Sequence, residues 1–161
     1  MFLSCALLLV VLTSSAQTKI LVFSKTAGFR HSSIIPGKPA IIQLGNENGF
    51  AVDTTEDATL FTDAVLKQYN AIVFLNTTGD VLNNVQQVAL ERYIQSGGGF
   101  MGIHAATDCE YNWPWYGKLV GAYFKGHPKT QSAKLNVIDK SHISTAPVSY
   151  THLTLPTILL V

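Results

Sequence analysis

The sequence predicts an α/β domain in which helices cover both faces of a mainly parallel sheet. Short, continuously apolar runs recur along the chain, and segments with helical spacing of apolar residues separate them. A strand that is apolar throughout is buried on both faces, and its alternation with helices is typical of parallel sheets. The chain has 161 residues, which suits one domain.

Four apolar runs are the predicted strands of this sheet. In chain order they cover residues 20–23, 50–54, 71–75 and 100–103, and a fifth strand is expected over residues 134–139. In open parallel sheets, ligands bind at the carboxyl ends of the strands. The predicted binding region therefore consists of the loops that leave the four strands. These loops span residues 24–33, 54–59, 76–80 and 104–110.

Three helices are predicted between the strands. They cover residues 36–48, 62–68 and 83–95. In the first helix, Pro36 or Pro39 occupies the first turn, where a missing backbone N–H is harmless, and Gly49 follows the last turn. In the third helix, apolar residues recur at helical spacing between Leu82 and Tyr93, which predicts one buried face.

The two ends of the chain differ from this central region. Residues 1–17 are expected to be a secretory signal, because an apolar run too short to span a bilayer precedes small residues. The alternative is a buried first strand or helix. Residues 148–161 carry no charged side chain. They begin like a translated sequencing adapter, so we expect a non-native tail, with a real apolar strand as the alternative.

Charge and cysteine content exclude several classes of function. The net charge is +1 and no basic cluster is present, so we predict no nucleic-acid partner. Cys5 falls in the expected signal segment, which leaves Cys109 alone in the expected domain over residues 18–147. A single cysteine excludes an internal disulfide and a metal site built on cysteines. The expected protein is exported, periplasmic or extracellular, without a stable membrane span after cleavage.

The end of the fourth strand carries the most informative motif, GIHAA over residues 102–106. Small residues two positions before and after a central residue are typical of a nucleophile elbow, a sharp strand-to-helix turn. The central residue is Ser in esterases and Cys in amidotransferases, and here it is His104. An imidazole serves as acid, base, metal ligand or hydrogen-bond partner rather than as the usual hydrolytic nucleophile. The alternative is a histidine satisfied by local backbone hydrogen bonds.

The first loop contributes Arg30 and His31. Together they suit an anion or the hydroxyl groups of a sugar, and the start of the following helix would add N–H donors. An exposed polar loop without a ligand is the alternative interpretation.

The stretch after His104 combines polar and aromatic side chains. Asp108 is followed by four aromatic residues within residues 111–116. Sugar rings stack their apolar faces on aromatic side chains, so this composition suits a carbohydrate pocket. The alternative is an aromatic cover over the edge of the sheet.

A metal site is a further interpretation of the same residues. His31, His104 and His127, with Asp108 or Glu110, offer the nitrogen and oxygen ligands that transition metals bind. Their spacing along the chain does not by itself indicate such a site. We predict neither a metal nor any other cofactor.

Three motifs together resemble the trehalose-utilisation (ThuA-like) family. They are GFRHSSI at residues 28–34, GGFMGIHAA at residues 98–106 and FKGHP at residues 124–128. The resemblance spans about residues 19–145 and implies a flavodoxin-like, class I glutamine amidotransferase-like fold, a three-layer sandwich. It also implies a link to bacterial disaccharide and keto-sugar metabolism, and fusion to or association with other modules in a larger exported protein. The family pattern continues further, so we expect an incomplete sheet.

The first functional hypothesis is a domain that acts chemically on a sugar. We expect His104, His31 and Asp108 to be its catalytic groups. The expected substrate-binding residues are Phe29, Arg30, Asn76, Thr77, Thr107, Trp113, Trp115 and His127.

Two other functional hypotheses remain, and the sequence disfavours one of them. The second is a sugar-binding or interaction module without catalysis. The third is a glutamine amidotransferase, which the sequence disfavours because the elbow holds His104 and Cys109 lies five residues later. The expected ligand is a small carbohydrate, and whether the protein is an enzyme stays open.

Overall fold

The computed structural model describes residues 17–129, 131–134, 136–146 and 152–155. Its centre is a four-stranded sheet with strand order β2-β1-β3-β4, and every neighbouring pair is parallel. The strands are β1 (Lys19–Phe23), β2 (Ala51–Thr55), β3 (Ala71–Leu75) and β4 (Gly99–Ile103). This architecture confirms the predicted α/β class.

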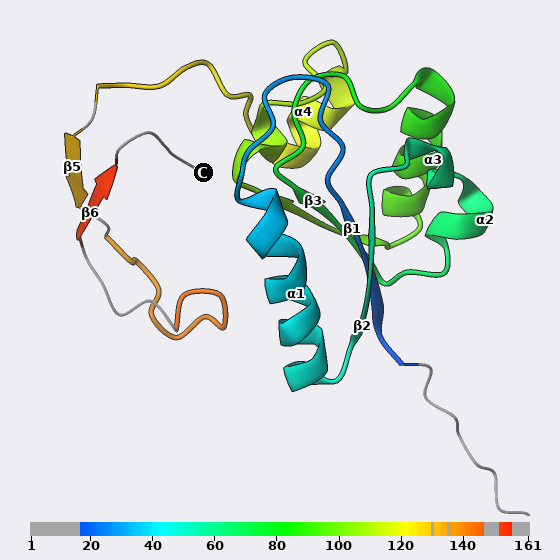
Figure 1. The fold of residues 1–161 in the computed structure, drawn as a ribbon, viewed down its shortest axis with the longest axis horizontal. Helices are drawn as coiled ribbons and strands as arrows, with labels where there is room; N and C mark the ends of the chain where they lie inside the picture. Colours follow the sequence, from blue (N-terminus) through cyan, green and yellow to red (C-terminus); the bar gives the residue numbers. More distant parts are fainter. Residues whose placement is uncertain (1–16, 130, 135, 147–151, 156–161) are drawn as a thin grey trace, which may run out of the picture.

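Helices cover both faces of the sheet (Figure 1). The structure contains α1 (Ile34–Asn48), α2 (Asp63–Leu66), α3 (Asn84–Gln95) and α4 (Pro114–Val120). Two 3₁₀ segments, η1 (Ala58–Leu60) and η2 (His104–Thr107), add single turns. Figure 1 shows α1 on one side of the sheet and α2 and α3 on the other.

Local chemistry explains where the predicted helices begin and end. The helix predicted over residues 36–48 starts at Ile34, because Ser33 already has helical backbone angles and His31 O accepts the N–H of Ile34. Asn83 caps α3 through a capping box with Gln86, so the side chains of both residues satisfy free backbone N–H groups. The aromatic stretch at residues 111–116 was not predicted to be helical, yet α4 begins there at Pro114.

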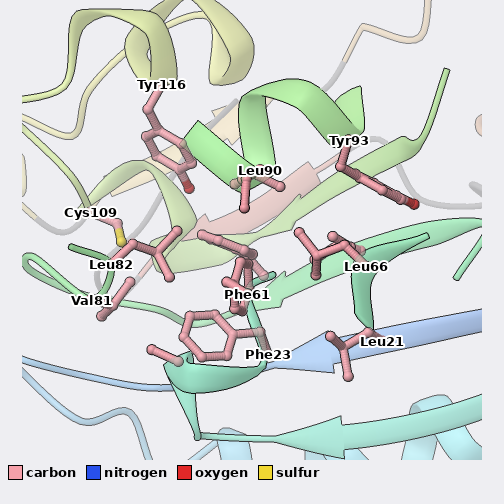
Figure 2. Close-up of a cluster of buried hydrophobic side chains, with 14 of the residues drawn as sticks. Leu21, Phe23, Phe61, Leu66, Val81, Leu82, Leu90, Tyr93, Cys109 and Tyr116 are labelled. Atoms are coloured by element: carbon pink, nitrogen blue, oxygen red, sulfur yellow. The ribbon is translucent and has the colours of Figure 1, made fainter. Parts of the chain in front are cut away.

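Alternate residues of each strand face opposite sides of the sheet. Val22, Val73 and Leu75 face α1 in the smaller of two apolar clusters. The opposite face carries the larger cluster, which Figure 2 shows in part. There Phe23 and Phe74 pack against side chains from α2, α3 and α4, and both phenylalanines are fully buried. Burying one such side chain contributes about 1.5–3 kcal/mol, so this face supplies most of the core.

The prediction of a fifth strand over residues 134–139 is wrong. The observed β5 (Gln131–Lys134) shares only Lys134 with that range and pairs antiparallel with β6 (His152–Leu155) in a separate two-stranded sheet. Ile138, an apolar residue in the predicted range, is 94% exposed. Without a buried face, nothing holds residues 136–139 in a sheet.

The predictions about the two ends fall largely outside the described residues. Of the expected signal segment only Gln17 is described, and of the expected tail only β6. Both predictions stand as made. None of the described helices is both long and apolar enough to cross a membrane.

Candidate functional site

Backbone hydrogen bonds join the loops that leave β1, β3 and β4. The Ala27 N–H donates to Thr78 O at 2.7 Å, and the Gly79 N–H donates to Asp108 O at 2.9 Å. Gly79 has a φ of +71°, and a Cβ there would lie 3.0 Å from the backbone nitrogen of Gly28. Glycine is required by both the left-handed backbone and this close approach. The three loops therefore form one surface.

The chain turns sharply at His104, immediately after β4. His104 has a φ of +53°, a left-handed conformation that costs energy for a residue with a Cβ. A Cβ on Gly102 would lie 3.0 Å from that of Ala106, which explains the small residues flanking the turn. This is the geometry expected of an elbow, with an imidazole at its tip.

Three histidines surround a small cavity at this turn. His31, His104 and His127 come from the β1–α1 loop, the elbow and the segment after α4. The rings of His31 and His104 are 4.6 Å apart and nearly perpendicular, at 78°. The cavity has a volume of about 50 Å³. Its remaining lining residues are Ala105, Thr107, Asp108 and Phe124.

His31 and His127 each contact the ring of a phenylalanine. The ring centroid of Phe29 lies 4.9 Å from that of His31, and the centroid of Phe124 lies 4.8 Å from that of His127. Phe29 is 70% exposed, whereas Phe124 is half-buried. Apolar rings therefore stand beside the histidines at the edge of the cavity. Phe124 belongs to the FKGHP motif, but no rule of spacing singled it out as a site residue.

The surroundings of His104 favour its neutral form. Partial burial lowers the pKa of His104, and the charges that His31 and His127 carry when protonated lower it further. A neutral imidazole has one nitrogen free to accept a proton. His104 is therefore available as a base or hydrogen-bond acceptor at neutral pH.

Asp108 and the segment after α4 are held together by Tyr111. The Tyr111 hydroxyl lies 2.6 Å from Asp108 Oδ1 and 2.8 Å from Phe124 O, and it has one proton to share between them. Burial and the neighbouring Asp108 raise the pKa of Tyr111, so the phenol stays protonated. The Phe124 N–H also donates to Thr107 O at 2.9 Å. These contacts fix the position of Phe124 against the elbow.

Arg30 does not line the cavity. Both terminal nitrogens of its guanidinium donate to the Glu56 carboxylate at 2.9 Å, and Lys38 Nζ lies 2.6 Å from the same carboxylate. These two cations lower the pKa of Glu56 to about 2. The expectation of free N–H donors at the start of α1 is wrong. Carbonyls of the preceding turn accept the N–H groups of Ile34, Ile35 and Gly37.

Four other expected binding residues lie away from the cavity. Trp113 is 8% exposed, packs on Trp115 and donates from Nε1 to Glu91 Oε1 at 2.9 Å. Trp113 belongs to the larger core cluster and Trp115 packs against it, whereas the alternative interpretation placed these aromatic residues over the edge of the sheet. Asn76 and Thr77 are buried at the end of β3, and Asn76 donates from Nδ2 to Ser33 Oγ at 2.7 Å.

Glu110 and Cys109 have structural surroundings instead of access to the cavity. The Glu110 carboxylate accepts the N–H groups of Val81 and Leu82, which removes it from the set of ligands considered for a metal. In the part of the chain that the structure describes, no three His, Cys, Asp or Glu residues are arranged to hold a metal ion. Cys109 is fully buried and donates to Gly79 O, and burial raises the pKa of its thiol to about 12. Such a thiol is not a nucleophile, which counts against an amidotransferase mechanism.

Comparison with known proteins identifies the family. The ThuA family model, described as trehalose utilisation, matches residues 19–156. The chain belongs to the ThuA family. The matched range includes the elbow at His104 and the segments that carry His31 and His127. No curated protein matches this chain.

A solved structure shares the fold. It is the crystal structure of a ThuA-like protein from Bacteroides uniformis ATCC 8492, with a TM-score of 0.70 and 24% sequence identity. The match covers 91% of this ThuA chain and 62% of the Bacteroides protein. This chain therefore spans less than two thirds of the length of that relative.

Proposed function

We propose that this ThuA-family domain binds a neutral sugar at the histidine cavity and acts on one of its oxygens by acid–base chemistry. The observation that carries the proposal is the meeting of His31, His104 and His127 with Asp108 around one cavity. Their source in three separate segments of the chain favours a binding role over local structural roles. The trehalose-utilisation description of the family supports a sugar as the ligand.

The size of the cavity limits what can enter it. Sites that enclose a whole small molecule usually measure about 300–1,000 Å³, whereas this cavity measures about 50 Å³. One hydroxyl or carbonyl group fits, and the sugar ring stays at the edge. Phe29 and Phe124 stand there beside the histidines, and their faces suit the apolar face of a pyranose.

The charges around the cavity favour a ligand without phosphate. Among the described residues, neither Lys nor Arg lines it, while Asp108 does. Arg30 is already bound to Glu56. Phosphate recognition generally uses Arg, Lys or free helix N–H groups. A hydroxyl group, by contrast, can donate to neutral His104 or to Asp108 and accept from His31.

The chemistry that follows is proton transfer at a sugar oxygen. Neutral His104 accepts a proton from the bound hydroxyl and, as the imidazolium, gives it back to the same oxygen, while His31 offers a second imidazole for proton transfer at a neighbouring oxygen. Asp108, held by Tyr111, orients the hydroxyl. General acid–base groups of this kind contribute about 10²–10⁴-fold to a rate.

A sugar-binding module without turnover is the second candidate. The shallow cavity favours it, because the structure leaves most of a sugar outside. Export of the protein and association with further modules belong to the same proposal. Detection of the processed protein outside the cytoplasm tests the export.

Calorimetry on the full chain tests the proposed function. Trehalose and its 3-keto derivative are titrated into the unsubstituted protein, His104→Ala and the control His142→Ala. His142 is exposed and bonded to Ser144, away from the cavity residues. The proposal expects binding that His104→Ala weakens and His142→Ala does not. Equal binding by both variants, or no binding by the unsubstituted chain, would contradict it. Chemical conversion of either sugar separates the enzyme from the binding module.

A further inference from the structure

Glu110 is the one acidic residue of the elbow region that is fully buried, and neither the proposed chemistry nor the sugar uses it. Its side chain is 1% exposed, and its backbone has a φ of +55°. Oε1 accepts the N–H groups of Val81 and Leu82, each at 2.8 Å, and Oε2 accepts an N–H from the Gln87 side chain at 2.7 Å. Three donors thus surround one carboxylate.

The backbone of Glu110 joins the same parts of the molecule. Its N–H donates to Gly79 O at 3.2 Å, and its carbonyl accepts the N–H of Trp113 at 3.0 Å and the hydroxyl of Tyr123 at 3.0 Å. Tyr123 precedes Phe124, which lines the cavity. The strained backbone and these bonds connect the β3–α3 loop, the start of α4 and the segment after α4.

Three cavity residues are connected to this junction along the chain or by hydrogen bonds. Asp108 stands two positions before Glu110, and its carbonyl accepts the N–H of Gly79, the residue whose own carbonyl receives the N–H of Glu110. Tyr123 is followed directly by Phe124, and His127 lies three residues further along the same segment. We expect a change at Glu110 to displace Asp108 on one side of the cavity and Phe124 with His127 on the other.

We propose that Glu110 is a positioning residue of the histidine cavity. It acts through Asp108 and the segment 123–127, without touching a ligand. The effect of Glu110 on sugar binding rests on the proposed function. The effect of Glu110 on the positions of the cavity residues does not. The three donors explain the residue type, because an ionised carboxylate is an acceptor at both oxygens and a glutamine is an acceptor at one.

The test uses Glu110→Gln, the double variant Glu110→Gln with Gln87→Glu, and the control Glu91→Gln. In Glu110→Gln, the new amide nitrogen faces the Gln87 amide nitrogen, so the Gln87 side chain must rotate to present its oxygen or lose the hydrogen bond. The double variant restores a donor–acceptor pair, because the amide at position 110 then donates to a carboxylate at position 87 on α3. Glu91 also accepts an N–H from the α4 region, that of Trp113 Nε1, but it has no bond to residues 108–110. Glu91→Gln therefore removes the same kind of carboxylate acceptor at a site that has no hydrogen bond to residues 108–110.

Imidazole NMR signals of the full chain, labelled at histidine, report on the cavity without any ligand. Glu110→Gln is expected to shift the signals of His104 and His127 and to move the pKa of His104 toward its ordinary value. The double variant is expected to return both toward the original values, and Glu91→Gln to leave them in place. Trehalose affinity is expected to fall about 5- to 10-fold in Glu110→Gln, as for one weakened hydrogen-bonded contact, and to recover in the double variant.

Two results would overturn the inference. One is a folded Glu110→Gln protein whose His104 and His127 signals coincide with those of Glu91→Gln. The other is loss of folding in both Glu110 variants, which would assign the residue to stability alone. Absence of trehalose binding by the unsubstituted chain would refute the proposed function. The NMR comparison would then still test whether Glu110 positions the cavity histidines.

Discussion

The Tyr116 hydroxyl links the buried core to the elbow, and removing it tests that link. The hydroxyl donates to Ala106 O at 2.7 Å, two residues after His104, and the side chain is fully buried. Burial raises the pKa of Tyr116, so the phenol remains a donor over the whole accessible pH range. In Tyr116→Phe the ring keeps its contacts with Trp113, at 5.7 Å, and Phe74, at 5.8 Å, so the change creates no large cavity.

The expected loss of stability follows from the Ala106 carbonyl, which loses its hydrogen-bond donor. A buried carbonyl left without its donor costs about 1–3 kcal/mol. For a domain of this size each kcal/mol lowers the melting temperature by about 2–4 °C, so we expect a decrease of about 2–12 °C. Because Ala106 belongs to the turn that carries His104, we also expect the His104 imidazole signal to shift.

Tyr93→Phe is the matched control for this experiment. The Tyr93 hydroxyl donates to Tyr69 O at 3.1 Å, and Tyr93 lies at the opposite end of the same apolar cluster from Tyr116 (Figure 2). Its loss is expected to lower stability by a similar amount and to leave His104 unaffected. Thermal unfolding followed by circular dichroism gives the first readout and imidazole NMR the second. Unchanged stability in Tyr116→Phe, or equal His104 shifts in both variants, would refute the link between core and elbow.

Three further predictions concern titration and reactivity. The folded-state pKa of Glu56 is lowered from 4.5 to about 2, so its stabilising contribution is present above about pH 4.5 and is lost as the pH falls toward 2. Because the carboxylate is exposed, the contribution is under about 1 kcal/mol, and acid unfolding of Glu56→Gln should show a shallower decline over that range. The pKa of His104 lies below its ordinary value; stability from neutral His104 is lost as the pH falls below about 6.5, and NMR titration of His31→Ala should show a raised His104 pKa. In a Cys5→Ser background, the buried Cys109 thiol, with a pKa of about 12, should resist a thiol reagent at pH 8 and react only after unfolding in urea.

The sheet was predictable because each strand carries its own signal. Runs such as Ala71–Leu75 are apolar throughout, and the observed β3 has the predicted bounds. The other three strands begin within one residue of their predicted starts. The strand predicted over residues 134–139 failed because the exposure of Ile138 cannot be deduced from its sequence neighbours.

The candidate site was predictable only where it followed from the rule that ligands bind at the carboxyl ends of parallel strands. Loops at the carboxyl ends of parallel strands meet in space, which brings His31 to His104. The rule says nothing about side-chain direction. Arg30 follows Phe29 in the same loop but turns to Glu56, 26 residues away, because that carboxylate offers two oxygens to its guanidinium. Trp113, just before α4, and Trp115, within it, pack on the core for an equally non-local reason, since the helix itself was not evident in the sequence.

Titration of trehalose into the full chain, labelled at histidine and followed by imidazole NMR, tests the central claim most directly. The account predicts saturable shifts of the His31, His104 and His127 signals. The His142 signal serves as an internal reference and should not move. Shifts confined to His142, or no shift of the three cavity histidines at saturating sugar, would contradict a sugar site at the elbow.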